Sequence, residues 1–459
     1  MPMSKFATTI AAISTPPGKG GVAVIRLSGP QAFEIAGRVF RPKGRRTPYS
    51  SPREAIYGEF LEGGCVIDDG LAIAFPAPAS YTGEDTVELS CHGGVLITRT
   101  LLEALLAAGA TPASPGEFTR RAYLSGRLAL SEAEAIATLL EAKSRAQVRL
   151  GASRGLLTDE ISASYSELLS LVSAEEALID FPEEDLSGLA EGELSSRLSS
   201  LIGRIRTLLA TYRTGRAVTE GVRTVIVGRP NVGKSSLYNL ILGEDAAIVS
   251  DTPGTTRDVL RSTVPLGPIL LQLADTAGMR ESSDPIERIG VERALAAASE
   301  ADLLVAVFDA SSPLCEEDRA MMRELTTEGE GVRIAVLNKS DLPPRIEQEE
   351  IEAHFKTVIP LSAKHGELEP LAAAVEELFT NRELVIGEAP IVASARQYAS
   401  LARSEEALAS ALSALLSGAP ADMVLYDLTE ALAALGEVDG HTVGEEIVSE
   451  IFSHFCVGK

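Results

Sequence analysis

A loop that can hold phosphate groups constrains the fold of this chain most strongly. Residues 228–235 read GRPNVGKS and directly follow the predicted strand 222–227. Where such a loop joins a strand to a helix, its glycines let backbone N–H groups close around phosphates, and the positive end of the helix faces them. We expect Lys234 to reach the β- and γ-phosphates of a nucleotide and Ser235 to bind Mg²⁺. The nucleotide-binding residues predicted here are Asn231, Val232, Gly233, Lys234, Ser235 and Ser236.

Four further polar motifs follow the phosphate loop. DTAG begins at Asp275 after the predicted strand 269–274, where its carboxylate can hold Mg²⁺ through water, and TTRD at 255–258 supplies a switch threonine. NKSD at 338–341 follows the predicted strand 332–337, and SAK at 362–364 follows the strand that ends at residue 360. Together these motifs exclude a chance glycine-rich turn. The candidate residues are Thr255, Thr256, Asp275, Thr276, Ala277, Gly278, Asn338, Lys339, Asp341, Ser362, Ala363 and Lys364.

The NKSD motif predicts which base is bound. A carboxylate on Asp341 can accept hydrogen bonds from the N1–H and the 2-amino group of guanine. Adenine offers neither donor and would leave the carboxylate unpaired, which is costly for a buried group. We therefore expect GTP or GDP as the ligand. The order and spacing of the five motifs resemble those of the GTPase superfamily.

The residue after DTAG departs from Ras-like GTPases, which have at this position a glutamine that orients the attacking water. Met279 cannot do this, because its thioether is at best a weak acceptor. Hydrolysis must therefore use another group. The polar residues just downstream either supply it or only form a solvated surface loop. No arginine finger stands out, so a second cation bound by the Asn231 amide oxygen could neutralise charge instead. The candidates just downstream are Arg280, Glu281, Asp284 and Glu287.

The pattern of strands and helices divides the chain, whose 459 residues suggest about three domains. Residues 1–118 mix short strands with turns, 119–216 have helical spacing, 217–382 alternate strands with helices, and 383–459 are helical again. The predicted fold class is multidomain α/β: an N-terminal α+β domain, a helical domain in two parts, and an inserted Ras-like P-loop GTPase domain with a mostly parallel, doubly wound sheet. The predicted strands are 6–13, 22–27, 56–60, 66–75, 86–90, 222–227, 269–274, 303–308, 332–337 and 356–360, and a helix is predicted at 94–108.

Charge and cysteine content limit the partners and the compartment. The net charge of −24 excludes a simple polycation that coats nucleic acid. The four cysteines lack the spacing of a disulfide framework or a zinc site. No apolar run approaches the roughly 18 residues of a membrane span, and the N-terminal stretch lacks the cleavage site of a signal peptide. We expect a cytoplasmic protein without a membrane span.

The N-terminal region and the chain end carry motifs outside regular patterning. Residues 80–88, 91–94 and 115–122 are rich in glycine, charge and aromatic groups, which suggests a pocket or an interface. His92 beside Cys91 could bind a metal or catalyse, but no second pair of ligands is near in sequence, so a structural role is favoured. Cys456 is either a reactive thiol or part of an apolar anchor.

The whole set of motifs resembles one family over essentially the full length. It is similar to the MnmE (TrmE) tRNA-modification GTPases, because other GTPases share the nucleotide motifs but neither end of the chain. Departures are small: Arg127 stands where lysine is common, and Val457 where isoleucine is usual. The motifs are TPPGKGGV at 15–22, residues 80–85, CHGG at 91–94, residues 115–122, DFPEE at 180–184, the asparagine-containing phosphate loop, DTAGMR at 275–280 and FCVGK at 455–459.

The resemblance implies a function and partners. The family works with MnmG, a flavoprotein that carries FAD, in a heterotetramer or larger complex. It adds an aminomethyl or carboxymethylaminomethyl group at C5 of the wobble uridine 34 of certain tRNAs. The one-carbon unit comes from a tetrahydrofolate derivative (5-formyl or 5,10-methylene form) held by the N-terminal domain, which also forms a homodimer. Pairing of the two GTPase domains, assisted by K⁺, stimulates hydrolysis.

The resemblance also assigns roles to residues by position. Glu287 matches the residue that organises the hydrolytic water, and with Lys234 and Cys456 it completes the catalytic candidates. The expected Mg²⁺ ligands are Ser235 and Thr256. The expected K⁺ ligands, which also belong to the GTP site, are Asn231, Ser250, Thr252 and Thr255. The expected folate contacts are Arg26, Glu88, Arg127 and Lys459.

Two other interpretations stay open. A regulatory GTPase, such as a ribosome-assembly switch, would carry a basic RNA-binding module after the GTPase domain, whereas residues 390–459 are acidic to neutral and helical. The other is a folate-dependent transferase with an accessory GTPase domain, which largely agrees with the interpretation as a tRNA-modification GTPase. Since the net charge of the chain is −24, binding of tRNA needs a local basic patch or a partner protein that is positively charged. The basic run 38–46 is better interpreted as a solvated loop, so we expect MnmG to make much of the RNA contact.

Overall fold

The computed structural model describes residues 6–180, 191–243, 261–274, 301–327, 331–380, 385–453 and 455–458. The chain forms two compact units, Met1–Ala137 with Leu432–Lys459, and Thr138–Ala431. The domain limits expected after residues 118, 216 and 382 stay predictions.

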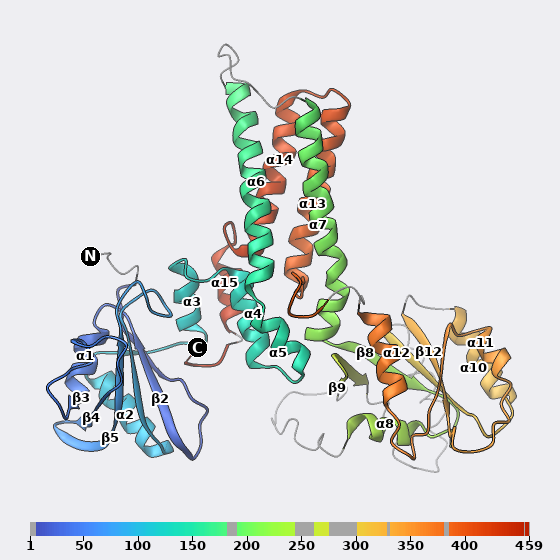
Figure 1. Cartoon of the computed structure of the whole chain (residues 1–459), viewed down its shortest axis with the longest axis horizontal. Coiled ribbons are helices and arrows are strands. Elements are labelled where there is room, and N and C mark those ends of the chain that lie inside the picture. The colour runs from blue at the N-terminus through green and yellow to red at the C-terminus, as the bar shows by residue number, and fades with distance from the viewer. Residues whose placement is uncertain are drawn as a thin grey trace. The chain divides into compact units, whose positions relative to one another are not determined.

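The first unit is built on a seven-stranded sheet with the strand order β3-β4-β5-β6-β2-β1-β7. Neighbouring strands pair antiparallel except β1 and β7. Helices α1 and α2 cover one face (Figure 1), because alternate side chains such as Leu27 and Leu89 point to that side and are fully buried. The elements are β1 (Ile10–Ile13), β2 (Gly20–Ser28), α1 (Ala32–Val39), β3 (Phe40–Pro42), β4 (Ile56–Glu62), β5 (Cys65–Phe75), β6 (Thr86–Gly93), α2 (Val95–Ala107) and β7 (Thr111–Pro112).

The two ends of the chain meet in this unit. Helices α3 (Glu117–Leu124), α4 (Leu130–Leu140) and α15 (Glu445–Ser453) lie there, and Leu130 of α4 and Phe452 of α15 belong to one buried cluster with Phe455. After α15, the backbone of Val457 forms an isolated antiparallel bridge with Pro115. The hydrophobic pattern alone does not reveal this packing, since α15 and α4 are separated by about 300 residues of sequence.

Long helices form one part of the second unit. The helical stretch after residue 140 is divided into α5 (Arg145–Ala152) and α6 (Gly155–Asp180), and α5 begins at a capping box between Ser144 and Gln147. The helices α6, α7 (Glu191–Thr219), α13 (Ala395–Leu416) and the first half of α14 (Ala421–Asp439) run beside one another (Figure 1). Tyr212 of α7 stacks on Tyr398 of α13, with the two ring centroids 4.5 Å apart. Helices from both sides of the α/β region therefore pack together, as expected for an inserted domain.

The α/β region is a six-stranded sheet with the order β13-β12-β11-β8-β10-β9. All neighbours pair parallel except β9 and β10, so the prediction of a mostly parallel sheet is confirmed. One face packs on α8 and α12 and the other on α10 and α11, and the buried side chains of β11 alternate between the two cores. The elements are β8 (Val222–Val227), α8 (Lys234–Leu242), β9 (Arg261–Leu266), β10 (Ile269–Ala274), β11 (Leu303–Asp309), α10 (Glu316–Thr327), β12 (Val332–Asn338), α11 (Gln348–Glu352), β13 (Thr357–Pro360) and α12 (Glu369–Phe379).

Candidate functional site

The phosphate loop joins β8 to α8, as the sequence predicts. Two of its glycines allow close backbone approach: a Cβ at Gly228 would lie 2.5 Å from the Val307 carbonyl oxygen, and one at Gly233 would lie 2.0 Å from Asn338 Nδ2. Both glycines have positive φ angles, +153° and +98°, and Gly233 is the N-cap of α8. The loop therefore turns sharply enough to direct the first N–H groups of α8 at an anion.

Asn338 connects the phosphate loop to the SAK motif. Its Nδ2 donates to the Val232 carbonyl oxygen at 2.8 Å, and its Oδ1 accepts from the Ala363 N–H at 3.0 Å. The side chain is buried, since Asn338 is only 3% exposed. One amide thus fixes the distance between the phosphate loop and the SAK motif.

Asp341 lies beside the SAK motif with its charge stabilised. Ser362 Oγ donates to Asp341 Oδ1 at 2.7 Å, and this hydrogen bond, with the nearby positive charge of His365 and Lys364, keeps the pKa of the Asp341 carboxyl below its ordinary value. The carboxylate is therefore ionised at neutral pH and able to accept from two donors, as guanine recognition requires.

Asp309, at the end of β11, belongs to the site and was missed by the sequence analysis. Its Oδ2 accepts from Lys339 Nζ at 2.6 Å, and Lys339 also donates to the Asn231 carbonyl oxygen at 3.1 Å. Burial raises the pKa of Asp309, but hydrogen bonds from Lys339 and Ser311 outweigh it and leave the pKa below its ordinary value. Asp309 belongs to none of the five motifs. The only signal in the sequence was an acidic residue directly after the predicted strand 303–308.

The structure brings together only part of the predicted nucleotide site. Asn231, Val232 and Gly233 lie against Asn338 and Lys339, Asn338 accepts from Ala363, and Asp341 lies against Ser362. Lys234 Nζ donates to the Arg229 carbonyl oxygen at 2.7 Å within the loop, and the charge of Lys364 acts on Asp341. Ser235 and Ser236 are exposed at the start of α8. The predicted residues outside the described part of the chain are Ser250, Thr252, Thr255, Thr256, Asp275, Thr276, Ala277, Gly278, Met279, Arg280, Glu281, Asp284, Glu287 and Lys459.

In the first unit, Arg26 and Glu88 face each other across β2 and β6. They are register partners, and Arg26 Nη2 lies 2.8 Å from Glu88 Oε1. The guanidinium also lies near the rings of Tyr81 and Phe118, 5.3 and 5.6 Å from their centroids. The predicted motifs 80–88 and 115–122 therefore meet around Arg26.

Arg127, the third described folate candidate, lies close to the 80–85 loop. A Cβ at Gly83 would lie 3.2 Å from Arg127 Cγ and 2.9 Å from Ser125 Oγ. Ser125 Oγ in turn donates to the Thr82 carbonyl oxygen at 2.7 Å. The glycine at position 83 thus lets this loop approach the segment that carries Arg127.

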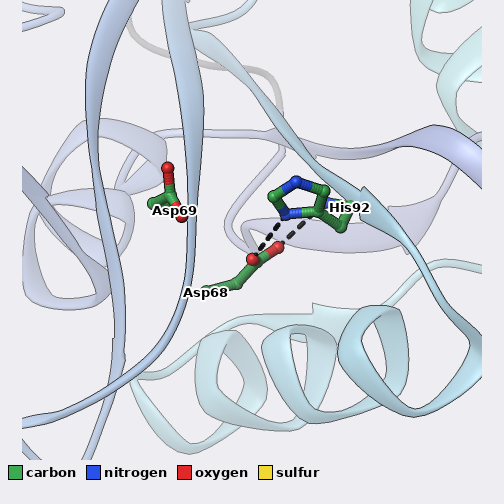
Figure 2. Close-up of side chains that lie close together, drawn as sticks. All are labelled: Asp68, Asp69 and His92. Atoms are coloured by element: carbon green, nitrogen blue, oxygen red, sulfur yellow. Dashed lines mark hydrogen bonds and ion pairs between the residues drawn. The ribbon is translucent and has the colours of Figure 1, made fainter.

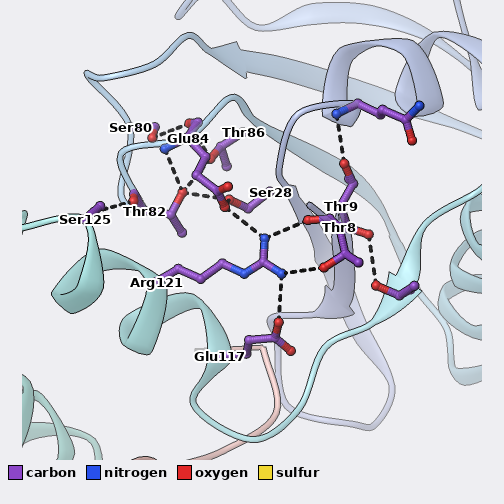
Figure 3. Close-up of polar contacts among 12 residues, drawn as sticks. Thr8, Thr9, Ser28, Ser80, Thr82, Glu84, Thr86, Glu117, Arg121 and Ser125 are labelled. Carbon is purple, nitrogen blue, oxygen red and sulfur yellow. Dashed lines mark hydrogen bonds and ion pairs between the residues drawn. The ribbon is translucent and has the colours of Figure 1, made fainter. Parts of the chain in front are cut away.

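A buried ionic network holds the 80–85 loop to α3 (Figure 3). Arg121 Nη1 lies 3.0 Å from Glu84 Oε2 and Nη2 lies 2.8 Å from Glu117 Oε1, and the Arg121 side chain is 3% exposed. Arg121 also donates to the Thr8 carbonyl oxygen at 2.8 Å, and Ser28 Oγ donates to Glu84 at 3.1 Å. The network joins the N-terminal segment, β2, the loop and α3, so it positions the loop that carries Tyr81.

The chain end lies on the same unit. Gly116 N–H donates to the Cys456 carbonyl oxygen at 3.3 Å, and Ser14 Oγ donates to the Gly458 carbonyl oxygen at 3.0 Å. Phe455 is buried, whereas the Cys456 residue is exposed. The sequence left open a reactive thiol or an apolar anchor at this end, and the structure shows an apolar anchor at Phe455 with the neighbouring thiol accessible.

His92 does have acidic neighbours, which the sequence analysis did not foresee (Figure 2). Ligand atoms of Asp68, Asp69 and His92 all lie within 4.8 Å of one another. Asp68 is already engaged, because it accepts from His92 Nδ1 at 2.7 Å and from the His92 backbone N–H at 2.8 Å. This hydrogen bond raises the pKa of His92. Tyr57 donates to Asp69 Oδ2, so both carboxylates serve hydrogen bonds of the sheet.

A phosphate loop between a central parallel strand and a helix, braced to an NKSD motif, defines a P-loop GTPase. Comparison with known proteins gives the family: residues 9–127 match the model described as the GTP-binding protein TrmE N-terminus, and residues 130–456 match the MnmE helical domain. The tRNA modification GTPase MnmE of Symbiobacterium thermophilum is 43% identical over 98% of this chain and 99% of its own length. That of Geobacillus kaustophilus is 41% identical over the full length of both chains. This chain belongs to the MnmE family of tRNA modification GTPases.

Solved structures similar to this chain include other GTPases. Aquifex aeolicus Era bound to GDP.AlF4- is 27% identical, covering 40% of this chain and 66% of that chain with a TM-score of 0.27. The G domain of the Thermotoga maritima FeoB is 24% identical, covering 34% and 96%, with a TM-score of 0.26.

Family membership makes this chain a GTP-hydrolysing enzyme that takes part in tRNA modification and uses its nucleotide with Mg²⁺. Ser235, the expected Mg²⁺ ligand, is the second residue of α8 and is exposed. Among the described helices, none is both long and apolar enough to pass through a membrane.

Proposed function

We propose that this chain hydrolyses GTP to support modification of uridine 34 in certain tRNAs, together with an FAD-dependent flavoprotein of the MnmG type. The modification adds an aminomethyl or carboxymethylaminomethyl group at C5, and the work takes place in the cytoplasm. The observation that carries the proposal is the Asn338 brace between the phosphate loop and the SAK motif, found in a chain of the MnmE family.

The nucleotide is held at both ends by this chain's own residues. N–H groups of the phosphate loop and the Lys234 ammonium bind the phosphates, and Ser235 with Thr256 holds Mg²⁺. The Asp341 carboxylate accepts from guanine N1–H and the 2-amino group, which its lowered pKa supports. Asp275, Thr276, Ala277 and Gly278 complete the γ-phosphate side by their motif.

We further propose that K⁺ and Glu287 replace an arginine finger and a glutamine. Asn231, Ser250, Thr252 and Thr255 supply oxygen ligands, and a monovalent cation near the β–γ bridge neutralises developing charge as an arginine would. Glu287 orients the attacking water, a role that Met279 cannot fill. Asn231 supports this proposal, because its backbone has φ +66° and its carbonyl oxygen is tied to Lys339, which fixes the loop that carries its amide.

The first unit is proposed to bind a tetrahydrofolate derivative in its 5-formyl or 5,10-methylene form and to form the homodimer. Arg26, Arg127 and Lys459 offer positive charge for the folate carboxylates and polar edge, and Glu88 offers an acceptor for the amino-type donors of the pterin. The convergence of Arg26, Tyr81 and Phe118 supports a site that combines charge with aromatic surface. Cys456 is proposed as a catalytic candidate because its thiol is exposed while its neighbours are anchored.

Reconstitution with components left out one at a time tests this function. Purified chain, the flavoprotein, folate, GTP, an unmodified tRNA and a nitrogen donor (ammonium for the aminomethyl group, glycine for the carboxymethylaminomethyl group) should yield the modified nucleoside, detected by mass spectrometry of digested tRNA. Omission of GTP or of folate should abolish the product. Product formed at full rate without folate would refute the assignment of the first unit, while leaving the GTPase assignment intact.

The cation proposal has its own test. GTP turnover should rise sharply in K⁺ over Na⁺ at equal ionic strength, and Glu287→Ala should retain nucleotide affinity while losing turnover. Equal rates in the two salts would rule out the cation, and full turnover by the variant would move the role to another group.

A further inference from the structure

Among the residues that the structure describes, the helix α5 and its flanks carry a run of exposed positive charge without acidic partners. Between Glu141 and Asp159 the sequence has no acidic residue and four cations: Lys143, Arg145, Arg149 and Arg154. All four residues are exposed. None has an acidic side chain within ion-pair distance among the residues that the structure describes, and none donates a side-chain hydrogen bond there. We call these four residues the α5 basic surface.

This arrangement differs from the other basic run of the chain. In the segment 38–46, Arg41 and Lys43 both contact Glu59, and Arg46 contacts Glu54, at distances between 2.6 and 3.4 Å. Those cations are neutralised locally, which fits the interpretation of that segment as a solvated surface. The α5 basic surface lacks such acids, so its field extends outward toward a partner.

The α5 helix is also firmly anchored, so its charges have fixed places. Ala146 and Leu150 are buried in the core that contains the β8 side chain Val222, and Gln147 Nε2 donates to the Thr219 carbonyl oxygen at the end of α7 at 3.2 Å. With these residues inside, Arg145 and Arg149 lie one helical turn apart, about 6 Å along the axis. The helix therefore presents two guanidinium groups from an anchored backbone that is joined to the GTPase core.

The chemistry selects a polyanion with regularly spaced phosphates. Arginine is suited to phosphate because its guanidinium offers several donors in a fixed plane. A chain with net charge −24 repels a polyanion over most of its surface, so contact is confined to a local positive site. The family acts on tRNA, and the α5 basic surface offers little apolar area for a protein partner beyond Val148, which is 48% exposed.

We propose that the α5 basic surface contacts the phosphate backbone of the tRNA substrate. The inference rests on the proposed function only for the identity of the RNA. Since α5 packs on the GTPase core, RNA bound there is held directly against the nucleotide domain. The contact contributes affinity without sequence readout, because phosphates carry no base information.

The test compares the salt dependence of tRNA binding. The full chain, the double variant Arg145→Gln/Arg149→Gln, and the matched control Arg41→Gln/Arg46→Gln are titrated with a labelled unmodified tRNA at about 50 and 200 mM salt. Two lost phosphate contacts lower the slope of log affinity against log salt by about 1.4–1.8, so the wild-type chain should lose roughly 7- to 12-fold more affinity than the double variant over this range. The control, with the same charge change, should behave as the wild type.

Folding and function are monitored separately. K⁺-stimulated GTP turnover of both variants should match the wild type, which shows an intact GTPase domain. An unchanged salt slope in the double variant, or no tRNA binding by the wild-type chain at about 50 mM salt, overturns the inference. Loss of flavoprotein binding with an unchanged tRNA slope would assign the surface to an acidic protein and also overturns it. Failure of the proposed function would appear instead as absence of modified nucleoside with the wild-type chain.

Discussion

Truncation of Asn338 should separate the two halves of the nucleotide site. The Asn338→Ala change removes the donor to Val232 and the acceptor for Ala363, both in surroundings that are at most 9% exposed. Each lost hydrogen bond, with the orphaned buried partner it leaves, costs about 1–2 kcal/mol, so the arrangement loses about 2–4 kcal/mol. GDP binds the arrangement that Asn338 holds together. In the variant, binding must restore this arrangement, so the free energy of GDP binding becomes less favourable by the same amount.

The expected result is weaker GDP binding by roughly 30- to 700-fold, measured by titration calorimetry or with a fluorescent GDP analogue. The matched control is Asn239→Ala, since Asn239 is an exposed residue of α8 with no side-chain hydrogen bond among the described residues. It should bind GDP within about twofold of the wild type. A change below about threefold for Asn338→Ala would refute the brace as the element that sets the site.

Three shorter predictions concern the base, the ionic network and a thiol. Asp341→Asn should weaken GDP by at least about 30-fold and favour xanthine nucleotides, since the amide offers a donor where xanthine has an oxygen; competition binding measures both. Arg121→Met should destabilise the first unit by about 3–5 kcal/mol, because Glu84 is left buried without its ion pair; hydrogen exchange of β1 and β2 reports it. Burial, with the charge of a nearby aspartate, raises the pKa of Cys91 to about 11, so at pH 8 iodoacetamide should label Cys456 and spare Cys91. The stability that the Cys91 thiol contributes is present below pH 9 and is lost as the pH rises toward 11.

Each of these has a control or a contradicting outcome. Arg99→Met removes an exposed pair with Glu103 and should cost less than about 1 kcal/mol. A similar cost for both arginine variants would mean that the buried network does not hold the loop. Equal labelling of the two cysteines at pH 8 would contradict the burial of Cys91, and undiminished guanine preference in Asp341→Asn would move base recognition elsewhere.

The strands of the GTPase sheet could be predicted where most of the residues are apolar. The predicted bounds 222–227 and 269–274 are those of β8 and β10, because central strands covered on both faces need mostly apolar residues, with Arg223, Thr224 and Gln272 as the exceptions. Strand β9 was not predicted, because RSTVPL mixes polar residues with a proline and pairs only with β10 at the sheet edge.

Contacts between distant segments set the limit for the candidate sites. The motif order placed Asn338 and Asp341 in the nucleotide site, but the pairing of Arg26 with Glu88 depends on the register of β2 and β6, which no local pattern encodes. Asp309 has no motif of its own. The unpaired state of Arg145 on α5 could not be predicted either, since it depends on where the acids of other elements lie.

The central claim is that guanine nucleotide turnover by this chain supports wobble-uridine modification. Nucleoside analysis of tRNA from a strain that lacks the gene tests it most directly, after complementation with the wild-type chain or with Asp341→Asn expressed at equal level. We expect the wild type to restore the C5-modified uridine and the variant, deprived of guanine recognition, to leave it absent. Full modification with the variant, or none with the wild type, would contradict the claim.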